Sequence, residues 1–297
     1  MILGRVTQGE LLRQLATNIA NLQRQIATAQ TQVSTQRKLQ NASDDPAGAA
    51  QVNRLNNQTS ALAAVTSSIG FGTAVLSAED SALQQTDSLL TRATEIASQT
   101  TSGLVTPAQR QQAANEVTQI ESTILSLANT AVAGRHVFGG LATGTQPFAN
   151  LDDPGFSPAT AYSGPTDPFT LPLGSGETVA LTTPGDQVFG AAISALDQMR
   201  QTLATGAEPA GSVDALTAAA AGIRAERASV GGRETRLQDQ TDQITSLTNG
   251  AQKVLSGIQD VDVTVAISQF VQLQATLQAT LAVGSKLQAS LLDYLQL

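Results

Sequence analysis

The sequence of 297 residues has no cysteine, no tryptophan, one histidine and few charged side chains. The lack of cysteine excludes disulfide bonds, thiol catalysis and Cys-ligated zinc. Only 13% of the residues are Asp, Glu, Lys or Arg, against roughly 25% in an average globular domain. Because the centres of protein interfaces are depleted of charge, this composition fits a chain whose surface is largely buried against other copies of the same chain. It fits a low-charge monomer equally well.

Charge and hydropathy narrow the range of partners. The formal net charge is −8, and the largest basic cluster is the pair Arg37-Lys38. Phosphate backbones repel such a surface, which argues against nucleic-acid binding. The opening MILGRVTQGELLRQL has no continuous apolar core, which predicts that no signal peptide is cleaved. No apolar run approaches the roughly 20 residues that span a bilayer, so we expect no membrane insertion.

Both ends of the chain carry apolar residues at the spacing of a helix that packs against other helices. The N-terminal stripe combines two series that step by seven residues: Leu15, Leu22, Ala29 and Ile19, Ile26, Val33. The C-terminal stripe consists of Ile267, Phe270, Leu277, Leu281, Leu291 and Leu295. We expect both stripes to form a self-assembly interface between subunits, because few charges lie outside them.

Two acids and a proline separate the first helix from the next. Asp45 suits the N-cap of a helix. Pro46 suits the first helical position, where its missing N–H costs nothing. We therefore interpret Asp44, Asp45 and Pro46 as the cap at which the chain restarts as a helix.

Two longer stripes predict the central helices. The first has an apolar residue at every seventh position: Leu55, Leu62, Ile69, Leu76, Leu83, Leu90 and Ala97. A helix of about 50 residues is ~75 Å long, so its stripe must face other long helices. Thr106 and Gln109 fit the capping box of the next helix, which we expect to end near Gly134. The returning stripe crosses Gly231-Gly232 in phase and consists of Leu216, Ile223, Val230, Leu237, Ile244, Ala251, Ile258 and Val265.

Residues 135–190 differ from the rest because they hold most of the prolines and aromatic residues. Short alternating pieces such as Thr178–Thr182 fit strands between Gly and Pro turn signals. We expect a small β-rich insertion with its own aromatic core, formed by Phe138, Phe148, Phe156, Tyr162, Phe169 and Phe189.

Together these segments predict a mainly α fold. Both chain ends contribute to a long antiparallel helical bundle or coiled coil, with the small β-rich insertion domain in the middle. The expected parts are an N-terminal coiled-coil helix of an inner core (1–42), a long helical hairpin (43–134), the insertion (135–190), returning core helices (191–255) and a C-terminal coiled-coil helix of the inner core (256–297).

No arrangement of residues predicts catalysis. Asp44 and Asp45 lack an accompanying His, Cys or Lys motif, so helix capping explains them better than paired catalytic carboxylates. His136 has no Cys or His at ligand spacing, which favours a structural or surface role over a metal site. Gly139-Gly140 lacks the rest of a phosphate-binding loop. We therefore expect no catalytic, cofactor-binding or metal-binding residues, and an enzyme would need convergent titratable groups in a pocket.

Several stretches resemble the bacterial flagellin superfamily. They are KLQNASDDPAGAA at 38–50, IQDVD at 258–262 and SLLDYL at 290–295. Further pieces resemble one branch, the hook-associated protein 3 family of the hook–filament junction. These are LANT at 127–130, GRHVFGG at 134–140, QPF at 146–148 and YSG at 162–164.

By that resemblance, the terminal helices would form the inner core of a tubular polymer, the middle helices its outer tube, and the insertion would face solvent. The chain would be a structural axial component that connects hook to filament for motility, outside the cell. It would travel through the flagellar type III exporter with an export chaperone, and its neighbours would be further copies, an adjacent hook-associated protein and flagellin. The alternatives are a short flagellin, which is the filament subunit itself, and a coiled-coil secretion or adhesion protein unrelated to flagella.

Overall fold

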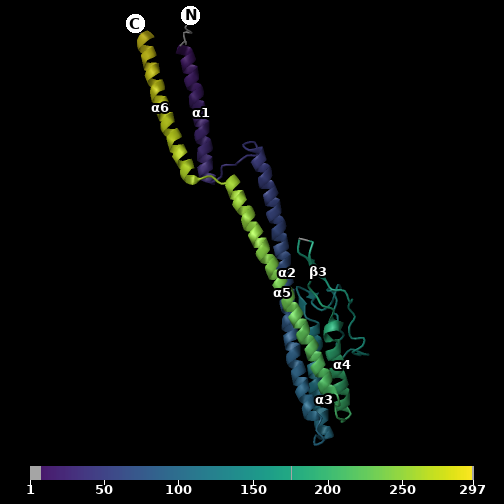
Figure 1. Ribbon diagram of the computed structural model, residues 1–297. Helices are drawn as coiled ribbons and strands as arrows, with labels where there is room; N and C mark the ends of the chain where they lie inside the picture. Colours follow the sequence, from purple (N-terminus) through teal and green to yellow (C-terminus); the bar gives the residue numbers. More distant parts are fainter. Residues whose placement is uncertain (1–7, 175, 296–297) are drawn as a thin grey trace. The chain divides into compact units, whose positions relative to one another are not determined.

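The computed structural model describes residues 8–174 and 176–295, which fold mainly into helices (Figure 1). The helices are α1 (Gln8–Thr35), α2 (Pro46–Thr100), α3 (Pro107–Ala128), α4 (Gly185–Ala204), α5 (Ser212–Gln259) and α6 (Val263–Leu295). The strands are β1 (Ala131–Val132), β2 (Arg135–His136), β3 (Thr170–Pro172) and β4 (Thr178–Ala180). This mainly α fold with a small strand region in the middle confirms the predicted fold class.

The chain divides into two compact units. Unit 1 comprises Met1–Ser60 and Leu247–Leu297, and unit 2 comprises Ala61–Ser246. Unit 1 contains α1, α6, the first turns of α2 and the last turns of α5. Unit 2 contains the remainder of α2 and α5 together with α3, α4 and the four strands.

The core of unit 2 is built on the seven-residue stripes of α2 and α5. Leu76, Leu83 and Leu90 of α2 are fully buried. Seven residues make nearly two helical turns, so each stripe stays on one face of its helix. The α5 stripe is buried in the same way and continues through Gly231-Gly232 without a break, as predicted. Its buried members in unit 2 are Leu216, Ile223, Val230, Leu237 and Ile244.

α3 begins at the predicted capping box. Thr106 Oγ1 accepts a hydrogen bond from Gln109 N at 3.3 Å, and Gln109 Oε1 accepts one from Thr106 N at 2.9 Å. The helix then packs against α4. An ion pair of 2.8 Å between Arg200 Nε of α4 and Glu121 Oε2 of α3 joins the two helices.

The predicted end of α3 near Gly134 is wrong, because the helix ends at Ala128. Asn129 follows as the C-cap, and its side chain turns the chain toward the insertion. Its Nδ2 donates to Phe148 O at 3.0 Å, and its Oδ1 accepts from Phe148 N at 2.9 Å. A side chain that bonds to distant backbone in this way leaves no periodic signal in the sequence.

The predicted stripe of α5 ends earlier than expected. α5 stops at Gln259, and Val265 lies in α6 with 50% of its surface exposed. The new helix starts because Asp262 Oδ1 accepts hydrogen bonds from Thr264 N at 2.9 Å and Val265 N at 3.1 Å, as an N-cap does.

The segment between α3 and α4 has less strand than predicted. β1 pairs antiparallel with β2, and β3 pairs antiparallel with β4, so each sheet has two very short strands. Phe138 lies edge-on to Phe189 with ring centroids 4.7 Å apart, and Phe148 lies 6.0 Å from Phe189. Because Phe189 belongs to α4, these aromatic rings are part of the main core of unit 2 rather than a separate core.

α2 also corrects an expectation about hydropathy. One stretch of this 55-residue helix is long and apolar enough, by composition alone, to cross a membrane. The expectation of no such stretch rested on uninterrupted apolar runs, whereas mean hydropathy averages over the Thr, Ser and Gly residues that interrupt them. The core helix of a folded unit passes the same test, and α2 supplies much of the core of unit 2.

Candidate self-assembly surface

The apolar stripe predicted on α1 is the least exposed part of that helix. α1 packs against α6 within unit 1, and the two helices lie side by side (Figure 1). Ala29 is 6% exposed and is the one fully buried side chain among those described in α1. The other predicted members are half-buried: Leu15, Ile19, Leu22, Ile26 and Val33.

α6 contributes a matching stripe to this pair. Ala266 is buried, and the predicted residues Phe270 and Leu277 are half-buried on the same side. Further along this side, a Cβ atom on Gly284 would lie 2.8 Å from Leu15 Cδ2, so the glycine lets the two helices approach closely. Pairing of the two chain ends, which the fold prediction required, is therefore observed.

Other apolar residues of α6 remain exposed beside this stripe. Ile267 and Leu281, predicted on the stripe, are 46% and 49% exposed. The predicted residues Leu291 and Leu295 lie outside the side chains that the structure describes. Sequence reasoning missed three further exposed aliphatic residues of α6: Val265, Val271 and Val283.

The absence of charge was the sequence signal that could have revealed them. Residues 263–285 contain no Asp, Glu, Lys or Arg. A helix that is apolar on all its faces is normally buried, and the uncharged α6 carries aliphatic residues outside the side that α1 covers. Exposed apolar patches mark interaction surfaces. α6 therefore offers a surface that further helices could cover.

The connections at the two helix interruptions of unit 1 are bonded to each other. Lys38 N donates to Gln259 O at 2.8 Å, and Val261 N donates to Gln36 O at 3.0 Å. Gln36 adopts a left-handed conformation with φ of 59°, which ends α1 and turns the chain. These bonds fix where α6 starts relative to the end of α1, and so fix the register of their pairing.

The residues interpreted as a restart cap all lie at the start of α2. The helix begins at Pro46, and Asp45 Oδ1 accepts a hydrogen bond from Gly48 N at 2.9 Å. Asp44 Oδ2 instead accepts from Asn41 N at 2.9 Å and closes the turn before the helix. Both carboxylates thus bind backbone N–H groups.

Two fully buried glutamates join pairs of helices in unit 2. Glu79 of α2 lies 3.4 Å from Arg233 of α5, which also pairs with Glu226. Burial raises the pKa of Glu79 to about 7, although the nearby Arg233 acts in the opposite direction. Burial likewise raises the pKa of Glu121 of α3 to about 7 against the effect of Arg200 of α4. Each arrangement consists of acids around an arginine, and in the first one the Thr183 hydroxyl also donates to Glu226 Oε1 at 2.7 Å.

His136 has a structural role. It is half-buried, and its Nδ1 lies 2.8 Å from Asn129 O, at the end of α3. Within residues 8–174 and 176–295, no group of three or more His, Cys, Asp or Glu side chains could hold a metal ion. The helix surfaces of α1 and α6 are the candidate functional site.

Two family models match the chain. The bacterial flagellin N-terminal helical region matches residues 11–143, and the bacterial flagellin C-terminal helical region matches residues 213–295. Together the two matches cover well over half of the chain and include most of α1, α2, α3, α5 and α6.

Two curated relatives are flagellar hook-associated proteins 3. The chain is 26% identical to that of Escherichia coli (strain K12) over 180 residues, which are 60% of this chain and 55% of the relative. It is 25% identical to that of Salmonella typhimurium (strain LT2) over 191 residues, 64% of this chain and 58% of the relative. The chain therefore spans little more than half the length of the curated relatives it matches.

Solved structures share the fold. FlgL of Bacillus cereus aligns with a TM-score of 0.59 at 20% identity, over 68% of this chain and 99% of that one. The flagellar hook-associated protein-3 of Legionella pneumophila aligns with a TM-score of 0.61 at 13% identity, over 70% of this chain and 98% of that one. With this fold and both helical regions matched, the chain belongs to the bacterial flagellin family.

Proposed function

We propose that this chain is a structural axial subunit of the bacterial flagellum, which polymerises at the hook–filament junction and connects the hook to the filament. Its similarity to two flagellar hook-associated proteins 3 supports this place. The observation that carries the proposal is α6, whose residues 263–285 are uncharged while several of its aliphatic side chains are exposed.

The α1–α6 pair has little core of its own. Among the described side chains of these two helices, only Ala29 and Ala266 are fully buried. Helical stability in water comes mainly from packing of an apolar face, and a Val, Leu or Ile side chain contributes about 1.5–3 kcal/mol when fully buried. Contact with neighbouring copies would supply the missing burial, so we infer that this pair is completed by assembly.

The proposed interface combines the half-buried stripe of α1 with the apolar residues of α6. Leu291 and Leu295 are included on the sequence pattern alone. The set is Leu15, Ile19, Leu22, Ile26, Val33, Ile267, Phe270, Leu277, Leu281, Leu291 and Leu295, extended by Val265, Val271 and Val283.

The remaining parts of the proposal concern route and neighbours. The subunit leaves the cell through the flagellar type III exporter, with an export chaperone. It assembles outside the cell between an adjacent hook-associated protein and flagellin. It acts as a structural protein and not as an enzyme, with no cofactor, nucleic acid or membrane insertion.

A deletion strain tests the junction role. We expect cells without this chain to build hooks, lack filaments and release unpolymerised flagellin, as seen by electron microscopy and by immunoblotting of the medium. Expression of the intact chain should restore swimming. Full filaments in the deletion strain would refute the junction role. Growth of long filaments from purified protein on seeds would instead favour a short flagellin.

Variants of α6 test the interface. Replacing Ile267 and Leu281 together by Gln should leave the chain exported but unable to support filaments, because both side chains are exposed in the single subunit. Leu141→Gln is the matched control, since Leu141 is 56% exposed in the insertion of unit 2. Normal swimming with the α6 variant would remove this face from the interface.

A further inference from the structure

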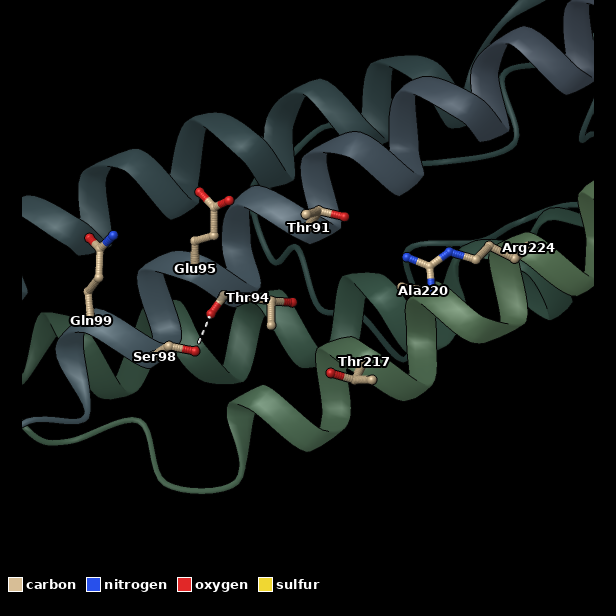
Figure 2. Close-up of a pocket in the computed structure, with 8 residues that line it drawn as sticks. All are labelled: Thr91, Thr94, Glu95, Ser98, Gln99, Thr217, Ala220 and Arg224. Carbon is tan, nitrogen blue, oxygen red and sulfur yellow. Dashed lines mark hydrogen bonds between the residues drawn. The ribbon is translucent and has the colours of Figure 1, made fainter.

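A groove of about 430 Å³ lies on unit 2 between the last turns of α2 and the first turns of α5 (Figure 2). Thr and Ser side chains form half of its lining, and Ala220, which is 4% exposed, forms its floor. The residues that line it are Thr91, Thr94, Glu95, Ser98 and Gln99 of α2, and Thr217, Ala220 and Arg224 of α5.

The hydroxyl groups in the walls are already bonded to their own helices. Thr91, Thr94, Ser98 and Thr217 each donate to the carbonyl oxygen four residues earlier, at 2.7 to 2.9 Å. Figure 2 shows one of these bonds, from Ser98 to Thr94. Because the hydroxyl protons are engaged, the walls offer threonine methyl groups and few free donors to a ligand.

The two charged residues of the groove are also paired. Arg224 Nε lies 2.9 Å from Asp87 Oδ1, and Glu95 Oε2 lies 3.0 Å from Arg92 Nη1. Each charge at the groove thus has an oppositely charged partner, with Arg92 shared between Glu95 and Glu116. The groove suits a short, uncharged, aliphatic side chain better than an anion or a cation.

Leu104 is such a side chain, and it has no place in its own subunit. It is 93% exposed, more than any other large hydrophobic residue among the described side chains. It lies in the loop TSGLVT between α2 and α3, at residues 101–106, which contains no charged residue.

The loop that carries Leu104 is held firmly in place. Arg110 is buried, and its guanidinium donates to the carbonyl oxygens of Thr100, Ser102 and Gly206, each at 3.2 Å. It also forms an ion pair of 3.0 Å with Glu208. A side chain presented on a fixed backbone loses little conformational entropy when it binds.

We propose that Leu104 of one copy inserts into this groove of a second copy. The proposal rests on the proposed function, because a polymer requires contacts between copies. Growth of a polymer rather than a closed pair requires this contact to run head-to-tail, with Leu104 of each copy in the groove of the next. Repeated contacts of this kind build rings or open helical assemblies rather than two-fold dimers.

Cross-linking tests the contact directly, since the chain has no cysteine of its own. Leu104→Cys and Thr217→Cys chains are mixed, allowed to assemble and oxidised. We expect disulfide-linked mixed dimers, several-fold more abundant than in a mixture of Leu104→Cys with Thr245→Cys. Thr245 is an exposed α5 residue that does not line the groove, so it is the matched control.

Assembly measurements give a second readout. Leu104→Ser removes the side chain and Thr217→Tyr obstructs the groove, and each should raise the concentration needed for assembly by roughly tenfold or more. Because both act on one contact, the double variant should be no worse than the more severe single one. Thermal unfolding of Leu104→Ser should match that of the parent chain.

Assembly at the parent concentration by both variants, without the 104–217 cross-link, would overturn the docking contact and leave the proposed function intact. A parent chain that assembles neither in cells nor when purified would overturn the proposed function and the contact together.

Discussion

At the residue scale, the buried acids are notable in a chain so poor in charge. Arg233 pairs with both Glu79 and Glu226, and Arg200 pairs with both Glu121 and Asp197. With both acids ionised, each group would carry one uncompensated negative charge away from water, which is unfavourable. Glu79 and Glu121, the fully buried acid of each group, therefore keep their protons to a higher pH than an exposed glutamate does.

This arrangement predicts that unit 2 loses stability as the pH rises from 4.5 to about 7. In the unfolded chain Glu79 and Glu121 ionise near their ordinary pKa of 4.5, whereas in the folded chain the pKa of each is about 7. The folded state thus binds more protons in this interval, so the free energy of unfolding falls with rising pH. The loss should be on the order of 1–3 kcal/mol per glutamate, complete once the pH exceeds the folded pKa.

Thermal unfolding between pH 4 and 8 measures the effect. Glu79→Gln keeps the shape without the charge and should flatten the profile, while Asp152→Asn at an exposed position should not. An unfolding temperature that rises steadily over this interval would show that these glutamates do not control it.

Gly140 is a second residue whose replacement should be severe. It adopts φ of +56°, and a Cβ atom there would lie 2.5 Å from Pro165 O. We expect Gly140→Ala to destabilise unit 2 by about 2 kcal/mol or more, through backbone strain and the clash. Gly144→Ala is the control, since nothing lies within 4 Å of its Cβ position. Equal urea midpoints for the two variants would contradict this.

At the element scale, periodicity predicted the long helices well because their stripes face other helices throughout. Leu76, Leu83 and Leu90 are buried because each repeat returns them to the same face. The stripe by itself did not mark the break after Gln259, because the apolar period passes from Ile258 to Val265 without interruption, and the predicted boundary between 255 and 256 lies a few residues before it. Where one helix stops is decided by a local cap, not by the period.

The cap at that break can be tested. Asp262→Ala removes the acceptor for the backbone N–H groups of Thr264 and Val265, so the start of α6 should lose about 1 kcal/mol of local stability. Hydrogen exchange at residues 264–266 should accelerate several-fold. Asp262→Ser, which can still cap, should recover most of the protection. Unchanged exchange in the Ala variant would mean that the backbone hydrogen bonds with residues 36–38, and not the cap, stabilise the N-terminus of α6.

The candidate interface shows the limit of a stripe in a sequence. Periodicity assigned all four residues Phe270, Leu277, Ile267 and Leu281 to one surface, whereas in the single subunit the first two are half-buried and the last two are exposed. A sequence indicates which residues are apolar, whereas the number of neighbouring helices decides how many faces are used. The insertion was hardest to predict, because hydrogen bonds from Asn129 to distant backbone, rather than strands, organise much of it.

At the scale of the whole molecule, the two units differ in how much of their apolar surface is buried. Unit 2 has a continuous core that includes three fully buried phenylalanines. The α1–α6 pair of unit 1 buries only Ala29 and Ala266 among its described side chains. The free energy of local opening follows such differences in burial.

We therefore expect hydrogen exchange in the dilute single subunit to be fast at residues 8–35 and 263–285 and slow in the core helices of unit 2. The assembled protein should protect both regions, because neighbouring copies then cover α6. The control is the exchange of α3, which should be similar in the two states. Equal protection of α1 and α3 in the dilute subunit would show that the terminal pair needs no neighbours.

The uncharged stretch of α6 has a consequence for the medium in which copies meet. Dissolved ions weaken attractions between exposed charges over a Debye length of about 8–10 Å near physiological ionic strength. Residues 263–285 contain no charged side chain whose interactions such ions could screen. The affinity between subunits that meet through this surface should therefore change little between low and high concentrations of sodium chloride. Sulfate, which is strongly excluded from protein surfaces, should raise that affinity.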